Sequence, residues 1–326
     1  MVQLSHIYFT VIHDFVNDKE NRMKTAILTD TNSGLTVEEG EKRGIYVLPM
    51  PVIVEENVYF EGVDITHDQL YDALRRGKEV SSSQPSPGDV MALWERILNK
   101  GYDELVYIPM SSGLSASCHN AVQLASEYES RVFVADNHRI SATLLEAVLD
   151  AKSLADQGRS GREIKEYLEQ TAMDATIYLT VDSLKYLKKT GRVTPVAAAI
   201  GSMLNIKPIL TIQGEKLDLF SKVRGNKQSG KKMIEAVRAD IAARFGEIPE
   251  EQVIVATAGT FEQEEDALCW LRFVQAAFPD KSVYYVPLSC SIACHVGINA
   301  VAVGAVAVTE RKEEAVHGLR LEKGAE

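Results

Sequence analysis

Two hydroxyl-rich segments, residues 81–86 and 111–117, have residue types and positions that suit anion binding. Both lie where a helix is expected to begin, and the second directly follows an expected buried strand over residues 105–109. In an open parallel sheet, ligands bind at the carboxyl ends of strands, and helix N-termini there offer free N–H groups to an anion. Serine hydroxyls add hydrogen-bond donors that carry no charge. The pattern predicts a site for a carboxylate or a small phosphate.

Serine also caps helices, so a structural interpretation competes with the binding one. Ser86 fits the structural interpretation best, because Pro87 follows it and Asp89 lies three residues further along. For the remaining candidates the sequence leaves both interpretations open. These candidates are Ser82, Ser83, Ser111 and Ser112.

His295 is the third candidate, in a segment of small residues that follows an expected strand and is expected to be a loop. Gly297, two residues later, permits a close approach of the backbone. A lone histidine is commonly structural, but hydroxyl and imidazole groups on three loops at strand ends could share one site. A serine–histidine enzyme acting on a small acyl or carbonyl substrate is the alternative. Residues 113–117 lack the nucleophile-elbow pattern, and no acid is evident for His295.

Two motifs that suggest a metal or a nucleotide fail on inspection. Cys290, Cys294 and His295 have the spacing C-x3-C-H, which matches no common zinc pattern even if Cys118 and His119 were added. We therefore expect buried thiols and no metal. Residues 225–232 superficially resemble a phosphate-binding loop, but Lys232 stands where magnesium binding needs serine or threonine. They are expected to begin a helix, and no cofactor is predicted.

Composition narrows the class of protein further. The 326 residues carry 35 Lys and Arg against 46 Asp and Glu, a formal net charge of −11, which argues against nucleic-acid binding. Four cysteines in so long a chain are typical of reduced thiols and a cytoplasmic location. Residues 1–22 lack a basic leader and a cleavage site, so they are interpreted as an N-terminal extension rather than a signal peptide.

The elements that must position these groups alternate between β-branched apolar runs and amphipathic helical stretches. This alternation predicts an α/β protein with a mainly parallel sheet. Residues 46–54 contain Pro49 and Pro51, so they cannot form one regular central strand. A new series of strands and helices begins near residue 175. We therefore expect an N-terminal extension at 1–22, one α/β domain at 23–175, a second at 176–318 and a tail at 319–326.

Seven short motifs in this order resemble the DegV family of bacterial fatty-acid-binding proteins. Together they span nearly the whole of residues 23–308. They occupy residues 29–33, 82–87, 111–115, 186–192, 205–210, 222–225 and 294–297.

The resemblance implies an N-terminal parallel α/β/α sandwich and a second α/β domain with a mixed sheet. It further implies a long-chain fatty acid in a tunnel between the two domains, with its carboxylate bound by Ser82, Ser112 and His295, and with Ser83 and Ser111 nearby. Some family members present the acid to an ATP-dependent fatty-acid kinase, which makes the acyl phosphate and links the family to phospholipid metabolism.

Two arginines, Arg192 and Arg224, match family arginines that serve the encounter with the kinase. Basic residues also cluster around them, which suits docking of an acidic partner, a transient membrane-surface contact or simply a solvated face. Because each buried methylene contributes about 0.8 kcal/mol, an apolar wall would dominate affinity. We expect uncharged polar groups at the head of the tunnel and no catalytic nucleophile.

Overall fold

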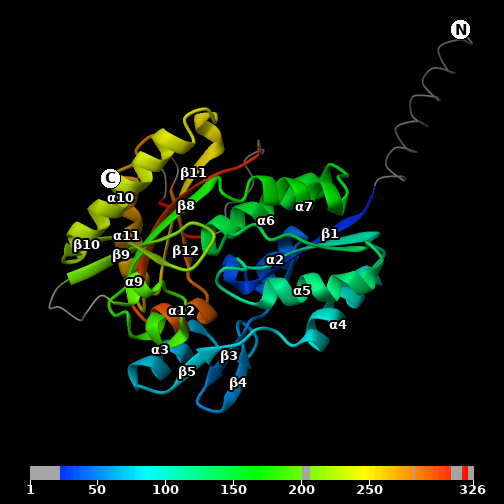
Figure 1. The fold of residues 1–326 in the computed structure, drawn as a ribbon, viewed down its shortest axis with the longest axis horizontal. Helices are drawn as coiled ribbons and strands as arrows, with labels where there is room; N and C mark the ends of the chain where they lie inside the picture. The colour runs from blue at the N-terminus through cyan, green and yellow to red at the C-terminus, as the bar shows by residue number, and fades with distance from the viewer. Residues whose placement is uncertain (1–22, 200–205, 282, 310–317, 322–326) are drawn as a thin grey trace, which may run out of the picture.

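The computed structural model describes residues 23–199, 206–281, 283–309 and 318–321. The expected N-terminal extension, residues 1–22, lies outside the described residues. Figure 1 shows a parallel sheet with its helices on the right and a mixed sheet with α10 and α11 on the left. A small antiparallel sheet lies at the bottom, next to α12.

The parallel sheet belongs to the first half of the chain and has the strand order β2-β1-β6-β7. Its strands are β1 (Thr25–Asp30), β2 (Tyr46–Leu48), β6 (Glu104–Ile108) and β7 (Val132–Val134). Successive residues of β1 point to opposite faces: Leu28 packs with α4 and α5, and Ile27 packs with α6 and α7. The sheet is therefore covered on both faces, as parallel sheets require.

The helices of this half begin and end largely where their caps predict. They are α2 (Val37–Arg43), α4 (Pro87–Leu98), α5 (Ser117–Ala125), α6 (Ser141–Asp156) and α7 (Gly161–Gln170). The Oγ of Ser86 accepts the N–H of Asp89, which confirms that this serine caps α4. Ser160 caps α7 in a full capping box with Glu163.

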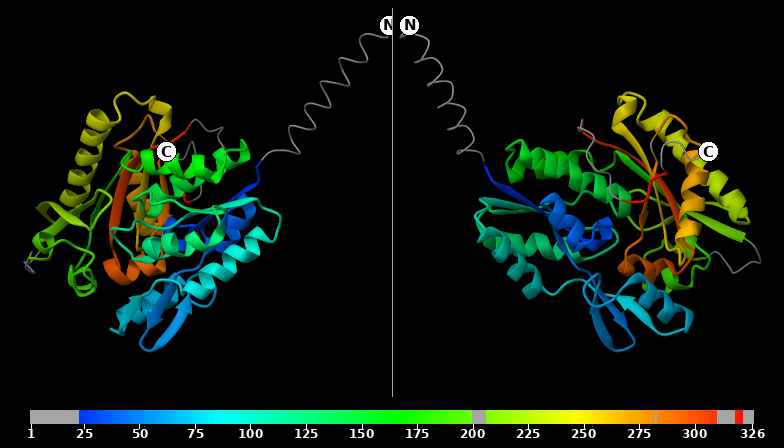
Figure 2. Two further views of the ribbon diagram at one scale, coloured as in Figure 1. Left: turned by 45° about the vertical axis from the view of Figure 1, so that its right-hand side comes forward. Right: turned by 180° about the vertical axis from the view of Figure 1, so that it is seen from behind.

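Residues 46–54 divide between two sheets, as the two prolines predict. The second part forms β3 (Pro51–Val54), the central strand of an antiparallel sheet with the order β4-β3-β5. Its other strands are β4 (Asn57–Phe60) and β5 (Val80–Ser82), joined through α3 (His67–Arg75). Figure 2 shows from two further directions that this sheet lies beside α12, drawn in orange.

The second half forms a mixed sheet with the order β10-β9-β8-β13-β11-β12. Its strands are β8 (Ala175–Thr180), β9 (Ile206–Ile212), β10 (Asp218–Arg224), β11 (Val253–Gly259), β12 (Tyr284–Pro287) and β13 (Val301–Ala307). Only β11 and β12 pair in parallel, so the mainly parallel pairing expected from the alternation holds for the first half alone. One face packs on α10 (Asn226–Arg244) and α11 (Glu264–Gln275), and the other faces the first half.

The remaining helices are short: α8 (Lys185–Thr190), α9 (Pro195–Ala198) and α12 (Cys290–Val296). Single turns of 3-10 helix are η1 (Thr31–Ser33), η2 (Ser126–Tyr128) and η3 (Glu250–Gln252). Leu319, assigned above to the tail, exchanges two backbone hydrogen bonds with Tyr285 of β12. Within the described residues, no helix is both long enough and apolar enough to span a bilayer.

Candidate functional site

A cavity of about 300 Å³ lies between the two halves of the molecule. Met50, Met110 and Leu114 of the first half contribute to its wall. Leu179 and Leu187 of the second half face them. Most of the other lining residues are also apolar, so the cavity is suited to a hydrocarbon rather than to a polar metabolite.

The cavity exists because two neighbouring strands present small residues to it. In the register of β11 and β13, Ala256 lies opposite Gly304 and Ala258 lies opposite Ala302, and all four line the cavity. The side chains of Val253 and Val255 point to the other face of β11, where they pack in the core under α10 and α11. β11 thus carries larger side chains on the face that packs under the helices and small side chains on the face that lines the cavity.

Ser82 and His295 meet at the wall of this cavity, although 213 positions separate them in the chain. The Oγ of Ser82, at the end of β5, lies 2.8 Å from the Nε2 of His295 on α12. Ser83 also lines the cavity. The structure therefore brings the first serine segment and the histidine together, as expected.

His295 is held in its neutral form. Burial, reinforced by the positive charge of Arg192, lowers the pKa of His295 from 6.5 to about 4. Its Nδ1 is buried and has no hydrogen-bond partner among the described residues. With the ring proton on Nδ1, the Ser82 hydroxyl donates to Nε2. With the ring proton on Nε2, the ring donates to the Ser82 Oγ, and the Ser82 hydroxyl proton is left for a ligand.

His295 lies on a helix, and the expectation of a loop was wrong. The Oγ of Ser289 accepts the N–H of Ile292 and so begins α12, which the run of small residues had obscured. Gly297 ends the helix with φ of +77°, and a Cβ there would come within 2.9 Å of the ring of Tyr186. The close backbone approach expected at this glycine is confirmed.

The second serine segment has a different role from the first. The Oγ of Ser111 donates a 2.5 Å hydrogen bond to the carbonyl of Gly214, and the amide of Ser112 donates to Asp136. A Cβ at Gly113 would meet backbone atoms of residues 214 and 215 at 2.6 Å. Neither Ser111 nor Ser112 is among the lining residues, whereas Ser115 is. This segment joins the two halves and contributes Ser115 to the wall.

Arg192 lines the cavity, so the expectation of only uncharged polar groups was wrong at this position. Its guanidinium donates to the carbonyl oxygens of Leu114 and Thr190, which ties the second serine segment to the end of α8. Arg224 instead lies exposed at the end of β10 and is not a lining residue. The two arginines therefore occupy different environments.

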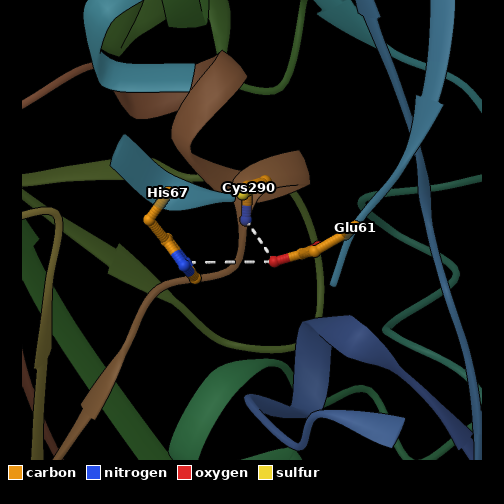
Figure 3. Close-up of side chains that lie close together, drawn as sticks. All are labelled: Glu61, His67 and Cys290. Atoms are coloured by element: carbon orange, nitrogen blue, oxygen red, sulfur yellow. Dashed lines mark hydrogen bonds and ion pairs between the residues drawn. The ribbon is translucent and has the colours of Figure 1, made fainter. Parts of the chain in front are cut away.

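Figure 3 shows Glu61, His67 and Cys290 gathered at the start of α12, with potential ligand atoms within 4.8 Å of one another. Glu61 and His67 already have hydrogen-bond partners within the fold. Glu61 accepts the amide of Cys290 and the hydroxyl of Thr31. His67 Nε2 lies 2.9 Å from the carbonyl of Leu288. Burial, with the nearby Glu61 carboxylate, raises the pKa of Cys290, which keeps the thiol protonated.

This cluster is therefore better explained as the anchor of α12 than as a metal centre. The carboxylate of Glu61 lies at the N-terminus of the helix, where the helix dipole favours negative charge. Asn32 provides a second anchor, because its Oδ1 accepts hydrogen bonds from Ser289 and Ser291. Sequence analysis assigned no role to Glu61 or Asn32. The polar run that follows β1 contains Asn32 and was an available signal for that residue alone.

The model of a protein family described as "Uncharacterised protein, DegV family" matches residues 24–308. The chain belongs to the DegV family. Among curated DegV domain-containing proteins, that of Deinococcus radiodurans is 34% identical over 245 residues, covering 75% of this chain and 85% of the relative. That of Clostridium acetobutylicum is 32% identical and covers 69% of this chain and 81% of the relative.

Solved DegV structures share the fold. One is described as fatty acid binding of a DegV family protein from Thermus thermophilus. It has a TM-score of 0.78 and 25% identity, covering 88% of this chain and all of that one. Another, described as DegV, a fatty acid binding protein from Bacillus subtilis, has a TM-score of 0.75 and 27% identity, covering 87% and 99%. The two-part α/β architecture expected from the motifs is confirmed.

Proposed function

We propose that this chain binds one long-chain fatty acid, with the acyl tail in the cavity and the carboxylate at Ser82 and His295. The observation that carries the proposal is the hydrogen-bonded Ser82–His295 pair in the wall of an otherwise apolar cavity. Solved relatives of the same fold, described as fatty-acid-binding proteins, support it. Ser83 and Ser115 line the same cavity and offer further hydroxyl donors.

The energetics favour the tail as the main source of affinity. Each buried methylene contributes about 0.8 kcal/mol, so a chain of ~16 carbons supplies on the order of 12 kcal/mol before the costs of binding. The head contacts then fix orientation. The neutral hydroxyl and imidazole leave the carboxylate its negative charge. Arg192 adds one cation, and its Nε and Nη1 donate to main-chain carbonyl groups. Ser111 and Ser112 serve this site by holding its second segment in place.

The Ser82–His295 pair also forms two members of a hydrolase triad. A triad needs an acid hydrogen-bonded to the second ring nitrogen, and the Nδ1 of His295 has no partner among the described residues. The pair therefore lacks the acid of a triad, and we assign it the binding of a carboxylate instead. We propose a carrier that has no catalytic nucleophile and needs no cofactor.

Native mass spectrometry of gently purified protein tests the proposal. We expect one fatty acid per chain, released by organic solvent and identified in the extract. Protein that carries no lipid, takes up none from added fatty acids and hydrolyses acyl esters would instead support the serine–histidine enzyme.

We further propose that the bound acid is presented to an ATP-dependent fatty-acid kinase through the edge strand β10. Phe220, Lys222 and Arg224 are exposed along the second part of this strand, after the exposed Asp218 at its start. The second part is therefore basic in a chain of net charge −11. Such a face suits an acidic partner, and an anionic membrane surface could use the same charges.

Charge reversal separates the roles of the two arginines. With a cognate kinase and ATP, Arg224→Glu should lower acyl-phosphate formation about tenfold, as expected when a repulsive pair replaces an attractive one at an interface. Lipid retention should not change. Arg192→Glu should reduce lipid retention itself, because Arg192 lines the cavity. Arg96→Glu makes the same change at an exposed position of α4 and is the matched control. Full kinase activity in Arg224→Glu would remove β10 from the interface.

A further inference from the structure

The N-terminus of α6 opens directly onto the cavity. Ser141, Ala142 and Thr143, the first three residues of this 16-residue helix, all line it. The N–H groups of a first turn have no acceptor within the helix. The residue at the capping position is Ile140, whose side chain offers none. A long helix thus presents its donors to an apolar cavity without a cap.

Ser141 adds a second, independent observation. It is 8% exposed, and its Oγ is buried without a hydrogen-bond partner among the described residues. A buried hydroxyl without a partner destabilises the state in which it stays unpaired. Thr143 differs, because its Oγ1 donates a 2.9 Å hydrogen bond to the carbonyl of Ile140. Ser141 is therefore the hydroxyl at this helix end that lacks a partner among the described residues, and its residue lines the cavity.

The charged groups near this helix end already have partners within the fold. Two buried carboxylates, Glu146 and Asp150, lie further along α6 and accept hydrogen bonds from Tyr284 and Thr309. Arg139 is the buried cation near them, and its guanidinium donates to main-chain carbonyls. A fatty acid carries one carboxylate, and that group is placed at Ser82 and His295. The ligand group left for this helix end is therefore a neutral oxygen that accepts and donates hydrogen bonds.

We propose that the N-terminus of α6 binds an oxygen atom on the acyl chain itself, so that the preferred ligands are hydroxy or keto fatty acids. This inference rests on the proposed fatty-acid binding. Ser82 and His295 would hold the carboxylate, and Ser141 with the first-turn N–H groups of α6 would hold the oxygen on the chain. An unsubstituted chain leaves these donors unpaired in an apolar wall, which is how a polar site discriminates against a ligand that lacks the matching group.

Competitive binding of stearic acid and a series of hydroxystearic acids, substituted at successive carbons, tests the proposal on delipidated protein. At least one positional isomer should bind about tenfold more tightly than stearate, the effect of pairing one buried hydroxyl. Ser141→Ala should remove that preference and leave stearate affinity unchanged or higher. Ser141→Gly should do the same while accommodating the φ of +55° found at this residue.

Thr143→Val is the matched control, because it removes a hydroxyl from the same turn that is already bonded within the helix. It should keep the preference for the hydroxy acid. Equal affinity of the wild-type protein for stearate and every isomer, or a preference that survives Ser141→Ala, would overturn the inference while fatty-acid binding stands. Failure of all these acids to bind would overturn the proposed function as well.

Discussion

Ala258→Phe is expected to lower the affinity for a long-chain fatty acid about 100-fold, because excluding roughly four methylenes at ~0.8 kcal/mol each costs about 3 kcal/mol. Ala258 lines the cavity from β11, opposite Ala302 of β13. A larger side chain at this position occupies space that the small residues leave to the ligand. Because it enters a cavity rather than a closely packed core, the protein should fold.

Titration of delipidated protein with a fluorescent fatty acid measures this effect, and native mass spectrometry gives the fraction of chains that carry lipid after purification. Ala242→Phe makes the same change at an exposed position of α10 and should bind as the wild type does. A folded Ala258→Phe protein with unchanged affinity would show that the acyl chain lies elsewhere.

Local rules predicted much of the fold. The cap at Ser86 and the break at Pro49 and Pro51 depend on neighbours a few residues away, and the structure has them as expected. The helix α12 was missed, because local rules do not show the distant residues that anchor it. Its cap is local, but its stability depends on Glu61 and Asn32, which come from distant parts of the chain.

The site residues could be predicted where a family motif contains them. The role of a residue could not be predicted where it depends on a hydrogen-bond partner distant in the sequence. Ser82 and His295 meet as the family motifs imply, whereas the hydroxyl of Ser111 is engaged by a carbonyl 103 positions away. No local pattern distinguishes a serine that binds a ligand from one that joins two halves of a protein. The small residues on β11 and β13 were visible in the sequence, but only their register shows that they face one another.

The anchoring of α12 connects the fold to the proposed function. Glu61 comes from the segment after β4, and Asn32 from the segment after β1, yet both bind the start of the helix that carries His295. Burial raises the pKa of Glu61, and it raises that of Asp30, two residues before Asn32 in the chain, to about 6. These carboxyl groups bind protons more readily in the folded protein, so they favour folding as the pH falls. A loss of stability in acid caused by His295 therefore has to be separated from the gain in stability that these two carboxyl groups give as the pH falls.

His295 is expected to make the delipidated protein less stable in mild acid. Its pKa is about 4 in the folded state against 6.5 as the ordinary value, so the unfolded chain takes up a proton that the folded protein does not. The stability is fully present above pH 6.5 and is lost as the pH falls toward 4. By linkage the loss is about 2 kcal/mol at pH 5 and about 3 kcal/mol at pH 4.

Urea unfolding at pH 7, 5 and 4 measures this loss as the difference between the wild type and His295→Gln, a variant that keeps a polar side chain but does not titrate. The variant should lose about 2 kcal/mol less than the wild type between pH 7 and pH 5, since both proteins share the opposing contributions of Asp30 and Glu61. His119→Gln is the matched control, because it removes an imidazole from the exposed surface of α5. Parallel pH profiles for the wild type and His295→Gln would mean that His295 is hydrated and takes up its proton in the folded state. The neutral imidazole on which the proposed carboxylate site depends would then be absent in mild acid.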